Sequence, residues 1–176
     1  MKNGTVSARM YQTRIDLPET TRRRSIESFN QLLASCLDLY TQVKQAHWNV
    51  KGKDFYQVHI LFDEVATAVF EPIDLLAERI TALGGIAHGT VMDAAENSAI
   101  PRYPDTDAMT EIDHLNALAD RLAVFAKQVR AAMDRTASWH DQGSSDICTQ
   151  ISREIDQKLW FVEAHLQESR MRSLTA

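Results

Sequence analysis

Two histidines and three acidic residues have the side-chain types and the spacing of a metal centre: His47, His59, Asp63, Asp74 and Glu78. Four of them lie in one predicted helix, at roughly 0°, 40°, 60° and 100° around its axis from His59 to Glu78. They therefore share one face, which an ordinary bundle helix would make partly apolar. Imidazole and carboxylate together suit iron(II), manganese or zinc, and a mixed set with open positions favours redox chemistry over a closed structural site.

The residues on this helix cannot all bind one metal within one chain. His59 and Glu78 are 19 residues apart, which is about 28 Å along a straight helix. The His59–Glu78 pair and the Asp63–Asp74 pair are, however, centred on the same point of the helix. Two antiparallel copies of the helix about a two-fold axis would place His59 opposite the partner's Glu78, and Asp63 opposite the partner's Asp74.

The centre of this pairing lies near Ala68 and Val69. The small side chains of Ala66 and Ala68 predict a close approach of the two helices there. Pro72 lies inside the same helix and has no N–H to donate to the carbonyl of Ala68, which predicts a kink. One such contact would create two identical sites.

His47 joins the site through a predicted helical hairpin. It lies six residues before the turn at Lys53, and His59 lies six residues after it. The two histidines should therefore lie level with each other in one subunit. We expect a half-site of His47, His59 and Asp63 in one chain, completed by the partner's Asp74 and the partner's Glu78.

Four long amphipathic segments position these residues. Apolar residues recur at helical spacing over residues 17–48, 55–83, 107–137 and 145–170. Capping pairs are expected at Asp16 with Glu19 and at Asp54 with Gln57. The connection between the second and third segments is long and is expected to hold a short helix at 92–98. This pattern predicts an all-α, ferritin-like four-helix bundle with a short extra helix in the long loop.

The composition fits a single globular domain. The chain has 176 residues, of which 44% are hydrophobic and 24% charged. We expect a mobile, mildly basic leader at 1–16, the helical domain at 17–170 and a C-terminal tail at 171–176. No segment has the pattern of a membrane span or a secretory signal. Cys36 and Cys148 lie inside helical patterns, as expected for buried thiols in a cytoplasmic protein.

Several motifs resemble one known family. Residues 44–52, KQAHWNVKG, resemble the histidine–tryptophan signature of the Dps family, the small ferritin-like DNA-binding proteins from starved cells. His59 with Asp63, and DLLAER at 74–79, are similar to its second signature. LGG at 83–85, YP at 103–104 and LWFVE at 159–163 also match. The similarity covers nearly the whole chain beyond the leader.

The resemblance implies a hollow shell of twelve identical subunits. It also implies ferroxidase centres at the two-fold contacts, with the five residues above as ligands and two iron sites per contact. In the family these centres oxidise iron(II), with hydrogen peroxide preferred over oxygen, and the iron(III) mineral collects inside. This consumption of iron and peroxide protects DNA and the cell from oxidative damage.

The resemblance also assigns three residues outside the ligand set. Trp48 corresponds to an aromatic side chain beside the centre, an electron donor or radical trap, although packing at a subunit interface is the simpler interpretation. Asp120 and Asp146 correspond to acids that line the pores through which iron enters and that attract cations electrostatically. A solvated face for Asp120 and an acid in a first helical turn for Asp146 are equally good interpretations.

The leader is the part of the chain expected to contact DNA, through Lys2, Arg9 and Arg14. The formal net charge of −5, from 19 basic and 24 acidic groups, argues against DNA binding by the body of the protein. Twelve copies of the leader would add avidity, so we expect weak, non-specific binding, and a nucleoid location in that case. A solvated tail without DNA contacts is an equally good interpretation.

Other functions remain open. A larger ferritin would need two Glu-x-x-His motifs within one bundle, and this chain has one, Glu111 to His114, which we expect to be a surface pair. A DNA-compacting structural protein without iron turnover is the main alternative. A zinc or manganese store is a third.

Overall fold

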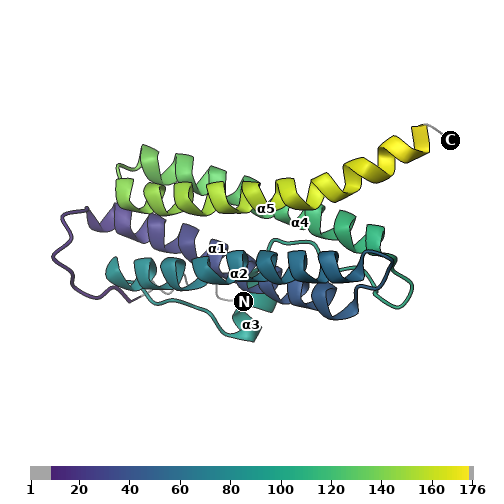
Figure 1. Cartoon of the computed structure of the whole chain (residues 1–176). Helices are drawn as coiled ribbons and strands as arrows, with labels where there is room; N and C mark the ends of the chain where they lie inside the picture. Colours follow the sequence, from purple (N-terminus) through teal and green to yellow (C-terminus); the bar gives the residue numbers. More distant parts are fainter. Residues whose placement is uncertain (1–8, 175–176) are drawn as a thin grey trace, which may run out of the picture.

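Four long helices and one short helix make up the protein (Figure 1). The computed structural model describes residues 9–174, with side chains up to residue 167. In chain order the helices are α1 (Glu19–Asn49), α2 (Phe55–Ala82), α3 (Val91–Asn97), α4 (Glu111–Ser138) and α5 (Gln142–Leu174). Residues 9–174 contain no β-strand, which confirms the predicted all-α fold.

The long helices pack as two antiparallel hairpins, α1 with α2 and α4 with α5 (Figure 1). The connection after α2 runs back along the bundle, so that α4 begins at the end opposite to the end of α2. The short helix α3 lies in this connection and packs against α1. The arrangement is the predicted four-helix bundle with one crossover. None of the helices between residues 9 and 174 is long and apolar enough to span a bilayer.

The core is built from the apolar faces of the four long helices. Phe29, Phe62 and Phe125 are fully buried in it. Cys36 and Cys148 are also fully buried, and both are free thiols. Burial raises the pKa of both, that of Cys148 to about 12. The interpretation of the cysteines as core residues is therefore confirmed.

The capping pairs predicted for α1 and α2 are wrong. The N-cap of α1 is Pro18, and no side chain caps the helix. Asp16 lies two residues before that cap, and Glu19 instead accepts a hydrogen bond from Arg23 one turn later. Asp54 does occupy the N-cap of α2, but its side chain makes no capping hydrogen bond.

The start of α4 is four residues later than predicted, at Glu111 instead of 107, because a capping box lies there. The Thr110 hydroxyl accepts a hydrogen bond from the Asp113 N–H, and the Asp113 carboxylate accepts one from the Thr110 N–H. This reciprocal pair satisfies two N–H groups that the helix cannot satisfy itself.

Helix α5 is longer than predicted at both ends. It begins at Gln142 instead of Ser145, because the buried carboxylate of Asp141 accepts a hydrogen bond from the Ser144 N–H at 3.0 Å. It continues to Leu174, so most of the predicted tail at 171–176 is helical. Its last turns extend beyond the rest of the bundle (Figure 1).

The described part of the leader is attached to the end of α2. The Tyr11 N–H donates a hydrogen bond to the Gly84 carbonyl at 2.8 Å, and the Arg22 guanidinium donates to the Leu83 carbonyl at 2.8 Å. The hydrogen bond from Tyr11 thus places this part of the leader beside the end of α2. Residues 1–8 lie outside the described part of the chain.

Gly84 ends α2 in a conformation that suits glycine alone. Its φ is +88°, and the Gly85 N–H then donates to the Ile80 carbonyl at 2.9 Å. An added Cβ would also collide with the Tyr11 carbonyl oxygen. The predicted end of this helical segment at residue 83 agrees with the C-cap at Leu83, and Gly84 also lets the leader approach.

We expect Gly84→Ala to lower the free energy of unfolding by about 1–3 kcal/mol, because the strained φ and the collision add to each other. Chemical denaturation followed by circular dichroism measures this loss. Gly89→Ala is the matched control, since a Cβ there meets only ordinary van der Waals contacts with Leu33 and Leu37. Equal losses in the two variants would contradict the proposed role of Gly84.

Candidate metal centre

His47 and His59 form a reciprocal pair close to the turn of the α1–α2 hairpin. Their rings stack with centroids 3.8 Å apart. The Nδ1 of His47 lies 2.9 Å from the His59 carbonyl oxygen, and the Nδ1 of His59 lies 3.0 Å from the His47 carbonyl oxygen. Since a carbonyl oxygen only accepts, each Nδ1 donates its proton, and in the neutral ring the lone pair is then on Nε2. The two rings are thus level, as the hairpin argument predicts, and fixed in a tautomer that can bind a metal.

Asp63 lies beside this pair on α2. Its Oδ1 is 4.0 Å from the Nε2 of His47 and 2.8 Å from the Nζ of Lys44. The hydrogen bond from Lys44 is the main cause that lowers the pKa of Asp63 below its ordinary value. Lys44 is not among the predicted site residues, although it precedes His47 by three residues and so lies on the same face of α1. His47 and His59 therefore meet within one chain, and Asp63 lies close to His47.

Asp74 and Glu78 lie further along α2, on its exposed side. Asp74 is 15 residues after His59, which places it about 22 Å away along the helix. Within the described residues of one chain, no three histidine, cysteine or acidic side chains converge on a point where they could hold a metal. One subunit thus presents a histidine-rich group at one end of α2 and a pair of carboxylates towards the other end.

An exposed stripe runs along α2 between these two groups. Its exposed members recur at spacings of three and four residues, and we define the stripe by Tyr56, Ile60, Asp63, Thr67, Phe70, Asp74, Glu78 and Thr81. Its central pair is Thr67 and Phe70, of which Phe70 is 56% exposed. Pairing in the antiparallel arrangement predicted above would place Phe70 opposite the partner's Thr67.

The close approach predicted at Ala66 and Ala68 is wrong. Both side chains are buried within the subunit, as is Val69. These residues lie near the centre of the pairing along the helix, but they point into the core because they are turned about 80–140° away from the middle of the stripe. Thr67 and Phe70 occupy the same level on the exposed side.

Trp48 is 68% exposed and follows His47 at the end of α1. It lines a surface cavity of about 1240 Å³, together with Lys44 of α1 and Tyr103 of the crossover connection. A largely exposed indole of this size is typical of a surface that another protein covers.

The interpretation of Glu111 and His114 as a surface pair is wrong for the histidine. His114 is fully buried, and its Nδ1 lies 2.8 Å from the Tyr103 hydroxyl oxygen. Burial lowers the pKa of His114 below its ordinary value. The reason is its position on the inward face of α4, next to the buried Leu115 and near Leu118. It therefore attaches the crossover connection to α4.

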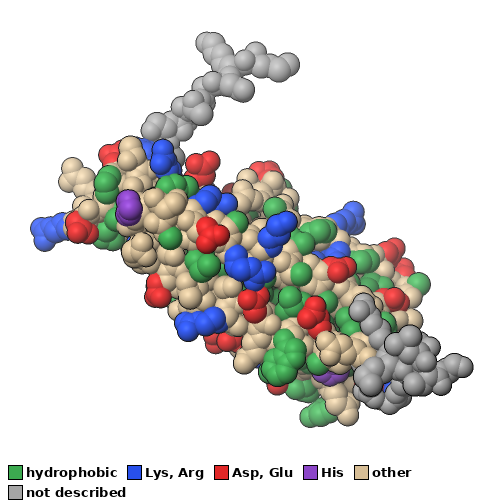
Figure 2. Space-filling view, turned by 90° about the horizontal axis from the view of Figure 1, so that it is seen from above, with side chains coloured by type: hydrophobic (Ala, Val, Ile, Leu, Met, Phe, Trp, Pro, Cys, Tyr) green, Lys and Arg blue, Asp and Glu red, His purple; other side chains and the backbone are tan. Residues whose placement is uncertain are grey.

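The other candidate residues lie on the surface. Asp120 is exposed on α4 and Asp146 is exposed on the second turn of α5. Arg9 and Arg14 are exposed in the leader, and Lys2 lies outside the described residues. Figure 2, which looks onto the side formed by α4 and α5, shows acidic and basic side chains interspersed, with no large patch of basic residues on that face.

Known proteins share both the sequence and the architecture. The profile of the ferritin-like domain matches residues 26–171. A DNA protection during starvation protein of Agrobacterium fabrum is 40% identical over 158 residues, covering 90% of this chain and 97% of the relative. General stress protein 20U of Bacillus subtilis is 27% identical, covering 80% of this chain and 96% of the relative.

Two solved structures extend these similarities to the whole bundle. DpsC from Streptomyces coelicolor superposes with a TM-score of 0.84 at 32% identity, covering 89% of this chain and 91% of that protein. The Dps protein of Vibrio cholerae, described as a member of a broad superfamily of ferritin-like diiron-carboxylate proteins, has a TM-score of 0.81 at 27% identity. Its alignment covers 91% of this chain and 99% of that protein.

Proposed function

Because this chain belongs to the Dps family of ferritin-like proteins, we propose that it oxidises iron(II) and stores the iron(III) product inside a hollow shell of identical subunits. The shell has twelve subunits in this proposal, and iron is its substrate and cargo. Removal of iron(II) and peroxide together would protect DNA and the cell, which agrees with the name of the Agrobacterium fabrum relative.

The observation that carries the proposal is the complementarity of the two ends of α2. One end has two imidazoles with free Nε2 atoms and an ionised carboxylate, at His47, His59 and Asp63. The other end has the exposed carboxylates of Asp74 and Glu78. An antiparallel contact between two subunits brings the unlike ends together twice, so each contact forms two mixed sites.

The donor set suits the proposed chemistry. Imidazole nitrogen binds iron(II) well, and the carboxylates from both subunits stabilise the higher charge of iron(III), which favours oxidation. With peroxide as oxidant, two iron(II) ions and two protons are consumed per hydrogen peroxide, and two iron(III) ions and two waters result. Oxygen serves as a slower oxidant in the proposal. Trp48, next to His47, would supply an electron when a single iron(II) is present.

Asp120 and Asp146 would attract iron(II) into the shell through its pores, since rings of carboxylates concentrate cations. We place the protein in the cytoplasm. DNA contacts through Lys2, Arg9 and Arg14 would be weak and would associate it with the nucleoid. The net charge of −5 opposes a stronger interaction.

Stopped-flow absorbance of iron(III) formation tests the ferroxidase proposal. We expect fast oxidation when hydrogen peroxide is added to the iron(II)-loaded protein, slower oxidation with oxygen, and a soluble mineral core. Purified protein that holds zinc or manganese and oxidises iron(II) no faster than buffer would instead support a metal store.

The basic leader supports one competing function, compaction of DNA without iron turnover. A gel shift at about 50 and 200 mM salt tests it, because binding through phosphate contacts weakens steeply with salt. A salt-sensitive shift without iron oxidation above the buffer rate would favour this alternative.

A further inference from the structure

Helix α2 carries both halves of the proposed centre, and Pro72 lies between them. Pro72 has no N–H, so the Ala68 carbonyl loses its helical donor. The thiol of Cys36 lies 3.1 Å from the next carbonyl oxygen, that of Val69, and donates to it from α1. One backbone hydrogen bond of α2 is thus missing between Asp63 and Asp74. Polar contacts beyond Pro72 therefore add to the buried Leu76 and Ile80 in setting the orientation of that half of the helix.

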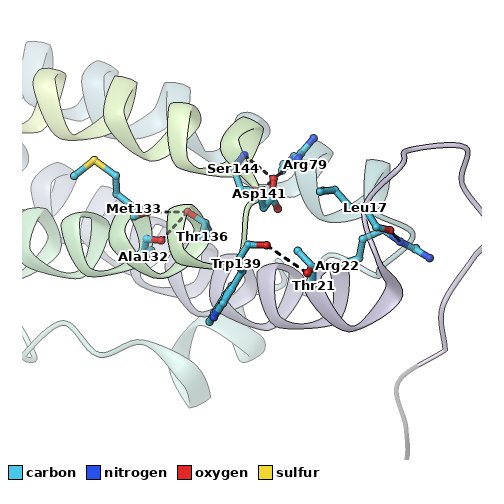
Figure 3. A network of polar contacts seen from close by, with 10 residues as sticks. All are labelled: Leu17, Thr21, Arg22, Arg79, Ala132, Met133, Thr136, Trp139, Asp141 and Ser144. Carbon is cyan, nitrogen blue, oxygen red and sulfur yellow. Dashed lines mark hydrogen bonds and ion pairs between the residues drawn. The ribbon is translucent and has the colours of Figure 1, made fainter.

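Arg79 provides such an anchor, on the residue that follows Glu78. Its Nη2 lies 2.6 Å from the Oδ1 of Asp141, and its Nε lies 3.0 Å from the Oγ of Ser144 (Figure 3). Gly143 leaves room for the guanidinium, since a Cβ there would lie 3.0 Å from Nη2. The planar guanidinium of Arg79 therefore binds Asp141, the residue just before α5, and Ser144 in the first turn of α5.

The acceptor of this anchor is held rigidly by α5 itself. The Asp141 side chain is fully buried. Its Oδ1 accepts the Ser144 N–H at 3.0 Å and its Oδ2 accepts the Ser144 hydroxyl at 2.6 Å. Burial alone would raise the pKa of Asp141, but the hydrogen bonds from Ser144 and the charge of Arg79 outweigh it and hold the pKa below its ordinary value. Asp141 is thus an ionised, preformed acceptor.

We propose that Arg79 is a positioning residue for the carboxylate half of the centre. Neighbouring residues of a helix have fixed directions relative to one another. Holding Arg79 against Asp141 and Ser144 therefore helps to fix the direction in which the preceding Glu78, and Asp74 one turn before it, leave the helix. This inference rests on the proposed function, because it assigns Asp74 and Glu78 to the metal. Partners that orient metal ligands typically change metal affinity about 10–100-fold when they are removed.

Titration of the purified, assembled shell with cobalt(II) tests the inference, because the visible absorbance of cobalt(II) reports both affinity and coordination geometry. We expect Arg79→Lys to weaken cobalt binding about 10–100-fold and to change the spectrum, since an ammonium group cannot bind Asp141 and Ser144 as a fork. Ser144→Ala should give a smaller loss in the same direction. Size-exclusion chromatography should show an intact shell for both variants.

Arg121→Lys is the matched control. Arg121 is 7% exposed and donates hydrogen bonds to Gln42 on α1 and to the Arg102 carbonyl of the crossover, without touching α2. The Arg121→Lys variant should lose thermal stability, as Arg79→Lys does, while its cobalt affinity stays within about twofold of that of the unmodified protein.

Three outcomes would overturn the proposed role of Arg79 and leave the proposed centre standing. They are cobalt binding by Arg79→Lys equal to that of the unmodified shell, an equal loss of cobalt binding in Arg121→Lys, or dissociation of the Arg79→Lys shell. The proposed centre itself is tested by His47→Ala in the same titration. Unchanged cobalt binding in His47→Ala would overturn the proposed centre, and the role of Arg79 with it.

Discussion

Shells mixed from His47→Ala chains and Asp74→Ala chains are expected to oxidise iron(II), although shells of either variant alone are not. Loss of a direct ligand should slow oxidation at least about 100-fold, since even loss of outer partners costs 10–100-fold in metal affinity or activity. In a contact between unlike chains, one centre lacks both residues. The other centre takes its histidines from the Asp74→Ala chain and its carboxylates from the His47→Ala chain, and is complete.

The size of the recovery follows from counting contacts. Random mixing in equal amounts makes about half of the two-fold contacts unlike, and each contributes one complete centre of two. About a quarter of all centres, and of the iron oxidation rate, should therefore return. Stopped-flow absorbance of unfolded and co-refolded mixtures measures this rate. No recovery in shells that contain both chains would exclude a centre shared between subunits.

The second large effect is expected from Phe70→Arg, which should prevent assembly of the shell. Phe70 is 56% exposed, and its ring contacts that of Tyr40, with centroids 5.3 Å apart. In the proposed contact it lies next to the two-fold axis, so the variant would bury two guanidinium groups near each other. An unpaired buried charge costs several kcal/mol, and the contact repeats throughout the shell. Multi-angle light scattering should show subunits or small oligomers.

Gln57→Arg controls for the added charge. Gln57 is also exposed on α2, but it lies about 100° around the helix from the middle of the stripe. Circular dichroism should show folded helices in both variants, because exposed substitutions usually change stability by no more than about 0.5 kcal/mol. An intact, active shell from Phe70→Arg would contradict the assigned axis.

The helices and the histidine half of the centre are the features that the sequence predicts well. Apolar spacing determines which residues of a helix face a core, so the four long helices lie where the pattern indicates. His47 and His59 meet because a short turn fixes the register of a hairpin. The first argument uses the regular period of a helix, and the second uses a separation of only a few residues along the chain. Tertiary packing changes neither the period nor the separation.

Apart from the helix caps, the features that the sequence does not reveal depend on contacts between segments far apart in the chain. Asp141 and Ser144 receive Arg79, more than 60 residues away, and no local pattern indicates that pairing. His114 becomes a core residue only because Tyr103 of the crossover provides a hydrogen bond. The prediction at Ala66 and Ala68 is wrong for a different reason. It rests on their position along the axis of α2 and takes no account of the direction in which their side chains point around that axis.

The proposed division of the ligands between two chains would make metal binding and subunit association one equilibrium. A ligand that binds only the associated form stabilises it by RT ln(1 + [L]/Kd), which is about 2.7 kcal/mol per site at a hundred times Kd. Two sites at each contact would double that free energy. The concentration at which subunits associate would then fall as the metal concentration rises, so the amount of assembled protein would itself report on free iron.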